Sequence, residues 1–253
     1  MDSQFSHTWQ VGRVRIRYAS TIRRPLRMQR PRQPISDRSA WKASERGKNR
    51  FVFALTDRHL ESIERAFDIV SRRALDVCAI SRHDFSFDGL EEDLEMRRDE
   101  VMWGSGLIVL SGVPISRYNK TRLGMIFWGL GTHFGDAVSQ SVMGDRLGHV
   151  IDVARKDYRE RAYRNSTELA LHTDACDMVG MICLHKARRG GVSGFASGTT
   201  IYNEILAQQP DPLNTLFDGY RYHRFGEQLP GAAPVTGERI PVFSERDGYL
   251  SVQ

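Results

Sequence analysis

The sequence predicts an α+β domain built on an antiparallel sheet or jelly roll with flanking helices. Helical periodicity dominates the chain from residue 56 to residue 130, and short apolar or alternating runs dominate from residue 148 onward. One further helix interrupts these runs. Helices followed by strands are typical of the α+β class, and 253 residues are enough for one domain with a good core.

Three helices are predicted in the first half. Thr56 is a suitable N-cap for the first, the second runs from residue 88 to about 103 with Gly104 as its stop, and the third spans 116–130. A short buried strand at 106–110 separates the last two. The apolar face of the first helix recurs at three- and four-residue steps: Leu60, Ile63, Phe67, Val70 and Ala74.

The second half predicts short strands around one helix. Thr199 caps a helix that ends near Gln209, and a glycine turn, Gly190-Gly191, precedes it. Strands are predicted at 148–154, through the His-Thr-Asp segment into 178–184, and at 192–197, 220–225, 240–243 and 249–252. The last two flank Glu245-Arg246-Asp247-Gly248, which indicates a hairpin.

The charge of the chain is unevenly distributed. The first 50 residues hold 13 Lys and Arg against three Asp and Glu, whereas the remaining 203 hold 23 against 28. The net charge of +5 therefore comes from the N-terminal part, and the body is mildly acidic. An acidic body without a nucleic-acid motif argues against nucleic acid as a partner.

Residues 1–35 are rich in arginine and proline, and we assign them to a basic, disordered arm outside a domain spanning 36–253. Residues upstream of the true start, an organelle transit peptide and a nucleic-acid-binding arm are the alternatives. No apolar run reaches membrane-spanning length and no signal-peptide pattern opens the chain, so we expect no membrane partner. Three cysteines form no disulfide framework, which favours a reducing, cytoplasmic setting.

His172 and Asp174 are the candidate metal ligands. In an extended chain both side chains leave the same face, with Cα atoms roughly 6.5 Å apart. A His-x-Asp pair plus a remote second His forms the 2-His-1-carboxylate triad of non-haem Fe(II) oxygenases. The pair alone is a weak signal, since a hydrogen-bonded His beside a turn Asp gives the same spacing.

The residues around this pair resemble the TauD/TfdA (taurine dioxygenase-like) family of Fe(II)/2-oxoglutarate oxygenases. The resemblance covers roughly residue 36 to the end and rests on three segments: Tyr163–Asp174, Gly190–Ser193 and Gly106–Gly112. It implies a distorted double-stranded β-helix (jelly roll, clavaminate synthase-like), with iron at its mouth. It also implies an oxidoreductase that hydroxylates a small-molecule substrate with O₂ while 2-oxoglutarate is decarboxylated to succinate.

The resemblance also assigns roles to single residues. His172 and Asp174 match the first two iron ligands, and Ser193 matches a hydroxyl that hydrogen-bonds 2-oxoglutarate. Asn165 lies where the family often lines the substrate or cosubstrate pocket. An ordinary turn serine and a loop-capping asparagine are the alternatives for the latter two, and Cys176 is interpreted as a packing residue.

The chain departs from the family pattern after Asp174. The family carries its second iron His and its 2-oxoglutarate-binding Arg later, but only His185 and His223 follow Asp174, and neither fits that motif. We therefore expect a C-terminally truncated oxygenase with feeble or no turnover. Its open sheet edges would allow two copies of the chain to associate as a homo-oligomer. A non-catalytic jelly-roll binding protein of the same descent is the alternative, and a nucleic-acid-associated protein ranks last.

Overall fold

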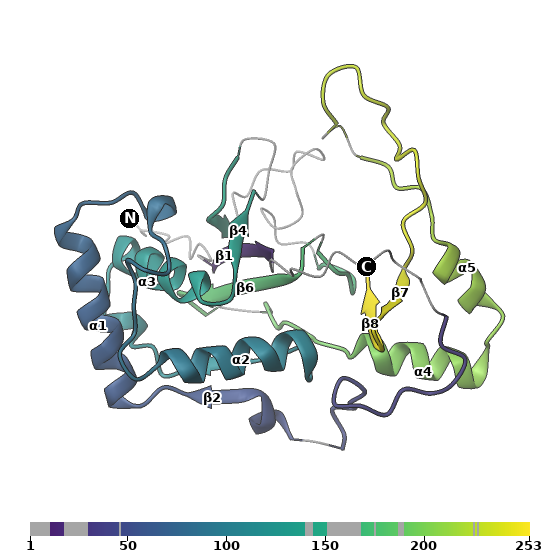
Figure 1. The fold of residues 1–253 in the computed structure, drawn as a ribbon, viewed down its shortest axis with the longest axis horizontal. Helices are drawn as coiled ribbons and strands as arrows, with labels where there is room; N and C mark the ends of the chain where they lie inside the picture. Colours follow the sequence, from purple (N-terminus) through teal and green to yellow (C-terminus); the bar gives the residue numbers. More distant parts are fainter. Residues whose placement is uncertain are drawn as a thin grey trace, which may run out of the picture.

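A computed structural model describes residues 11–17, 30–45, 47–139, 144–150, 168–174, 176–186, 190–224, 226 and 228–253. Within these ranges the chain is mixed helix and strand with small sheets, which agrees with the predicted class (Figure 1). In chain order the elements are β1 (Val11–Arg17), η1 (Lys48–Phe51, a 3₁₀ turn), β2 (Val52–Ala54), α1 (Asp57–Arg72), η2 (Val77–Ala79, 3₁₀), α2 (Glu91–Trp103), β3 (Val109–Ser111), η3 (Ile115–Arg117, 3₁₀), α3 (Lys120–Thr132), β4 (Asp136–Val138), β5 (Gly148–Val150), β6 (Met178–Cys183), α4 (Gly198–Gln208), α5 (Pro212–Asp218), β7 (Phe243–Arg246) and β8 (Tyr249–Val252).

The first two helices confirm the sequence prediction. Thr56 caps α1: its hydroxyl accepts from the backbone N–H of His59, and the His59 ring accepts from the N–H of Thr56, both at 3.3 Å. This reciprocal pair satisfies two of the backbone donors at the start of a helix that have no partner within the helix. α2 starts at Glu91, three residues later than predicted, and ends before Gly104 as expected.

The third helix starts later than predicted because a different residue caps it. The side chain of Asn119 accepts from the N–H of Arg122 at 2.8 Å, which fixes the first turn of α3 after residue 119. Residues 116 and 117, predicted as the start of this helix, belong to the short η3 turn instead. The strand predicted at 106–110 is β3, displaced to residues 109–111.

The larger hydrophobic core lies among α1, α2 and α3, on the left of Figure 1. Met178, the first residue of β6, is buried in this core and so joins the central sheet to the helices. The buried members are Leu55, Ile63, Ala66, Val70, Ile80, Phe85, Phe87, Leu90, Leu94, Met125, Ile126, Trp128, Leu130 and Met178. Burial of this many large side chains makes the helical layer the main source of stability among the described residues.

The central sheet is organised on β1, which runs antiparallel to three later strands. Residues 15–17 pair with β4, residues 11–13 pair with β5, and residues 11–16 pair with β6. Because residues shared by two partners must use both edges of the strand, β6 lies on one edge and β4 and β5 lie on the other. Figure 1 shows this sheet between the helical layer and the C-terminal elements.

The arm assigned to residues 1–35 is not wholly outside the domain, so that prediction is wrong for two of its parts. Residues 11–17 form β1, whose backbone groups are satisfied by three partner strands. Pro31 and Ile35 lie against α4: the Tyr202 hydroxyl donates to the Pro31 carbonyl at 2.7 Å, and the Asn203 side chain bonds both backbone groups of Ile35. These contacts tie residues 11–17 and 31–35 to the rest of the domain in spite of the charge of this part of the chain.

The C-terminal part forms a second, smaller core of Tyr202, Leu213, Phe217 and Phe243. The predicted hairpin is confirmed as β7–β8, although its first strand runs through residues 243–246. Its turn residues Asp247 and Gly248 have φ values of 53° and 88°, as a two-residue hairpin turn of this hand requires.

Other predictions for this half need correction. Ser197, rather than Thr199, caps α4, since its hydroxyl accepts from the N–H of Thr200 at 2.9 Å. The segments 192–197 and 220–225 form no strand among their described residues. The second makes only isolated bridges, Tyr220 with Ile240 and His223 with Val235.

The pairing of β2 with β3 is parallel, which differs from the predicted antiparallel sheet. A parallel pair needs a crossover connection, and α1 and α2 supply it here. None of the helices in the described ranges combines the length and the apolar character needed to cross a membrane.

Candidate metal site

His172 and Asp174 lie in an irregular segment that leads into β6, and the strand predicted to carry them begins only at Met178. The backbone N–H of Cys176 donates to the carbonyl of Asp174 at 2.8 Å, so the chain turns there instead of staying extended. Pairing with β1 also starts at Met178, which faces Ile16. The prediction of two side chains on one face of a strand is therefore wrong in its backbone geometry.

The strand that follows is also less buried than its continuous apolar run suggested. Buried or half-buried positions alternate with exposed ones along β6, and Val179 and Met181 are exposed. A half-buried strand of this kind covers the helical core with one face only. The segment 168–174 therefore leads into a strand that has one exposed face.

The His172 ring is exposed and is oriented by its own backbone. Its Nδ1 lies 2.7 Å from the carbonyl oxygen of Ala170. Because a carbonyl only accepts, Nδ1 carries the proton, and a neutral ring then presents an unprotonated Nε2. Histidines that bind metals are commonly held through the second ring nitrogen in this way.

Asp174 is half-buried and lies two residues further along the same segment. A neutral imidazole nitrogen and a carboxylate oxygen suit Fe(II) in type. Among the residues that the structure describes, no group of three or more His, Cys, Asp or Glu side chains could hold a metal ion. The donor chemistry of these two side chains thus fits a metal in type, but the described residues form no complete metal site.

Gly190 and Gly191 end the turn predicted before Ser193, and residues 187–189 of that turn lie outside the described residues. Gly190 and Gly191 have φ values of 73° and 67°, a conformation that side chains disfavour, so glycine is needed at both positions. Ser193 follows in an exposed, irregular stretch that leads to α4. Asn165, the other predicted pocket residue, lies outside the described residues.

The remaining candidates have structural settings. Cys176 is half-buried and its thiol donates to the carbonyl of Met178 at 3.3 Å, which agrees with a packing role. His185 is exposed just after β6, and the backbone of His223 bridges to Val235.

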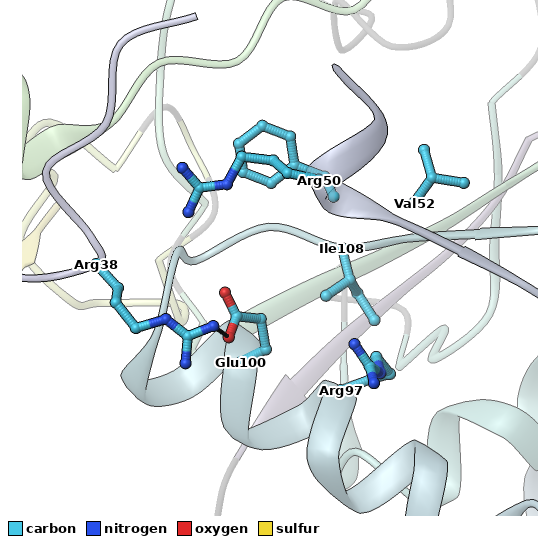
Figure 2. A pocket seen from close by; sticks show the side chains of 7 residues that line it. Arg38, Arg50, Val52, Arg97, Glu100 and Ile108 are labelled. Carbon is cyan, nitrogen blue, oxygen red and sulfur yellow. Dashed lines mark hydrogen bonds and ion pairs between the residues drawn. The ribbon is translucent and has the colours of Figure 1, made fainter. Parts of the chain in front are cut away.

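A pocket that the sequence analysis missed lies elsewhere, between η1 and α2 (Figure 2). Three arginines line it, and none of His172, Asp174 and Ser193 does. The sequence signal is a basic residue directly before an apolar run, Arg50-Phe51-Val52-Phe53. This pattern was indistinguishable from the many other arginines of the N-terminal part.

Comparison with protein families decides the relationship of the chain. The sequence model of "Taurine catabolism dioxygenase TauD, TfdA family" matches residues 71–247, which include His172, Asp174 and Ser193. The chain belongs to the TauD/TfdA family. The resemblance predicted from the His-Thr-Asp segment is thereby confirmed.

Two curated relatives of this TauD/TfdA chain have low identity. FR-33289 synthase of Streptomyces rubellomurinus (strain ATCC 31215) is 26% identical over 224 residues, which are 87% of this chain and 66% of that protein. Taurine hydroxylase-like protein SAT17 of Stachybotrys chartarum (strain CBS 109288 / IBT 7711) is 25% identical over 226 residues, or 85% and 57% respectively. The chain therefore spans less than two thirds of the length of either relative.

Proposed function

We propose that the chain is an Fe(II)/2-oxoglutarate-dependent dioxygenase, or the part of one that carries its first two metal ligands. The reaction would hydroxylate a small organic substrate as 2-oxoglutarate is decarboxylated to succinate. The single observation that supports this most is the His172-x-Asp174 pair within the segment that the TauD/TfdA model matches. When bound, the iron and the cosubstrate supply the activation of O₂.

In this proposal the chain's own residues hold and orient the metal. His172 binds through Nε2 while its Nδ1–H stays on the carbonyl of Ala170, which fixes the plane of the ring. Asp174 supplies the carboxylate. The Ser193 hydroxyl would hydrogen-bond 2-oxoglutarate, and Gly190 and Gly191 before it would let the backbone approach the cosubstrate. Asn165 contributes to the substrate or cosubstrate pocket.

The same proposal includes the detailed fold of the domain, its cellular location and its partners. We infer a distorted double-stranded β-helix, supported by family membership, with β6 as one of its strands. The name of one relative, a taurine hydroxylase-like protein, agrees with hydroxylation of a small molecule. Three further statements stay predictions: the chain is cytoplasmic, it has no nucleic-acid or membrane partner, and it forms a homo-oligomer through open sheet edges.

A non-catalytic binding protein of the same family is the second candidate. It is favoured by one observation: no third His, Cys, Asp or Glu joins His172 and Asp174 in the part of the chain that the structure describes. Two protein ligands hold a metal more weakly than three, because affinity depends on how completely the site is preformed. The two candidates differ in succinate release and agree in metal binding.

The test measures both quantities on the same variants. Mn(II), a stand-in for Fe(II), is titrated by electron paramagnetic resonance, and succinate release is measured with Fe(II), ascorbate and 2-oxoglutarate. We expect His172→Ala and Asp174→Ala each to weaken Mn(II) binding about tenfold or more. His83→Ala, which removes an exposed histidine before α2, is the matched control and should change nothing.

Each outcome separates the candidates. Succinate release that disappears in His172→Ala supports the dioxygenase. Metal binding through His172 and Asp174 without succinate release supports the binding protein. Equal Mn(II) affinity in His172→Ala and His83→Ala would contradict the site altogether.

A third ligand, if this chain holds one, is found with the same assay. His185 and His223 are the histidines after Asp174, so His185→Ala and His223→Ala are the first variants to measure. We expect neither to weaken Mn(II) binding. A tenfold loss in one of them would identify that residue as the third ligand.

A further inference from the structure

The pocket between η1 and α2 has a volume of about 400 Å³ and gathers three arginines around one carboxylate. As Figure 2 shows, Arg50 enters from the η1 side, whereas Arg97 and Glu100 rise from α2 on the other side. Val52 and Ile108 supply apolar wall. The lining residues are Arg38, Arg50, Phe51, Val52, Arg97, Glu100 and Ile108.

One arginine of this pocket is neutralised. The guanidinium of Arg38 donates to Oε2 of Glu100, drawn as the dashed line in Figure 2. The other oxygen of Glu100 accepts from the backbone N–H of Ser105 at 3.1 Å. Glu100 is the one carboxylate among the described residues that line the pocket, and both its oxygens are thus engaged by groups other than Arg50 and Arg97.

The other two arginines, Arg50 and Arg97, lie against aromatic rings and have no acidic partner among the residues that the structure describes. The guanidinium of Arg50 lies 5.0 Å from the ring centre of Phe51, and that of Arg97 lies 4.8 Å from the ring centre of Phe53. Within the described residues, Nη1 of Arg50 and Nε of Arg97 are buried with no hydrogen-bond partner. A buried charged donor without an acceptor is costly, so a partner for these groups would stabilise the pocket.

The neighbouring arginine on α2 shows the contrast. Arg98 donates to the carboxylate of Asp99 at 3.1 Å. Arg97, one position earlier, turns to the pocket and meets a phenylalanine ring. The pocket therefore carries two uncompensated positive charges, from Arg50 and Arg97, beside an apolar wall.

We propose that this pocket binds a small oxyanion, a carboxylate, phosphate or sulfate group, between Arg50 and Arg97. A guanidinium presents a planar fork of donors that matches the two oxygens of such a group, and stacking on phenylalanine fixes the plane of each fork in advance. Val52 and Ile108 would contact the aliphatic part of the ligand. The site is distinct from the His172 segment and does not depend on the proposed oxygenase reaction.

The test is calorimetric titration of the whole chain with sulfate, phosphate and succinate at constant ionic strength. We expect saturable binding of at least one of them. Arg50→Gln and Arg97→Gln should each weaken it about tenfold or more, because each removes a charge-assisted hydrogen bond. Arg65→Gln is the matched control: Arg65 is exposed on α1, pairs with Glu61 at 4.0 Å and should leave the affinity unchanged.

A second variant should act in the opposite direction. Glu100→Gln removes the competing negative charge, keeps an acceptor for the N–H of Ser105 and releases Arg38. We expect it to tighten binding several-fold. Where a Gln variant fails to fold, Arg50→Lys and Arg97→Lys keep the charge and lose the fork, and should still weaken binding.

The proposal is overturned if the wild-type chain shows no saturable heat with any of the three anions at millimolar concentrations. Equal affinity in Arg50→Gln, Arg97→Gln and Arg65→Gln would overturn it as well. The preference of the wild-type chain for phosphate, sulfate or succinate identifies the class of ligand.

Discussion

The helical layer and the segment that carries His172 and Asp174, the proposed metal pair, differ in how far their apolar side chains are buried. In the layer of α1, α2 and α3, residues such as Val70 and Leu94 are fully buried. In the metal-pair segment, here residues 168–174 and 190–197 on either side of β6, Leu171 is 70% exposed and Val192 is 92% exposed. Burial of apolar area stabilises a fold, so the helical layer can stand largely on its own contacts, whereas the metal-pair segment has few.

This difference separates stability from function along the chain. The helices are fixed by local caps and a shared core, and changes there should be costly. His172 and Asp174 lie in a segment tied down by Met178 and by turns, so changes there should affect ligands and not folding. The four predictions below test this separation in order of expected size.

The largest effect is expected from Phe85→Ala. Phe85 is fully buried and packs edge-on against Phe87 at 5.1 Å between ring centres. Its ring also lies so close to Gly129 that a Cβ at that position would clash with it. Loss of this ring should cost about 3–5 kcal/mol in the free energy of unfolding, measured by urea denaturation. Phe195→Ala, at a 61% exposed position of the metal-pair segment, is the control and should cost about 0.5 kcal/mol or less. Equal losses would contradict the separation.

The second prediction adds an atom to the same core. Ala at position 129 would place its Cβ 2.4 Å from the ring of Phe85, so Gly129→Ala should cost about 1–3 kcal/mol. Gly131→Ala in the same helix α3 meets nothing within 4 Å and should stabilise by about 0.5–1 kcal/mol. Thermal unfolding of the two variants should therefore shift in opposite directions.

The third prediction concerns pH. Burial lowers the pKa of His133 below its usual 6.5, while the bond from its Nε2 to the carbonyl of Phe85, at 2.8 Å, acts against that shift. Arg82 also lowers this pKa, and Glu91 and Glu95 raise it. Because the folded pKa is lowered, the unfolded state binds a proton at a higher pH than the folded state does. The contribution of His133 to stability is therefore fully present above the unfolded pKa and is lost as the pH falls through the folded pKa.

The free energy of unfolding should accordingly decrease as the pH is lowered from about 7 to about 5.5. The decrease should be smaller in His133→Gln, which has no titrating ring, and unchanged in His83→Ala, which removes an exposed histidine. Urea midpoints at several pH values measure it. An identical slope in wild type and His133→Gln would show that other groups carry the pH dependence.

The smallest effect on stability is expected at the metal pair itself. The His172 ring is exposed, and its partner among the described residues is the carbonyl of Ala170. His172→Ala should therefore change the metal-free unfolding free energy by about 0.5 kcal/mol or less. Its effect should appear only with metal: the stabilisation of the wild-type chain by Mn(II) should be absent in the variant. A large loss without metal would make His172 a structural residue.

Sequence patterns predicted the elements that are determined locally. Thr56 and Gly104 mark helix ends through contacts a few residues away, and the Asp247-Gly248 turn determines its hairpin for the same reason. The family followed from a short motif, because metal ligands and glycine turns recur at fixed spacing.

Elements that depend on distant partners were missed. Arg13, Arg15 and Arg17 alternate with Val14 and Ile16, a strand pattern hidden by a composition typical of disorder. The strand predicted at His172 is absent among the described residues because its pattern was local while its partner is distant. The run is apolar, but pairing with β1 begins only at Met178. Arg50 and Arg97 share a pocket through packing of η1 on α2, which no local pattern records.

The position of β1 has a consequence for the order of assembly during synthesis. Residues 11–16 leave the ribosome well before their partners in β6, residues 178–183. The helical core lies almost entirely within residues 55–130 and can collapse as soon as those residues have emerged. The N-terminal strand must therefore wait while most of the chain is made, and closing the sheet around it is the slow, long-range step of folding.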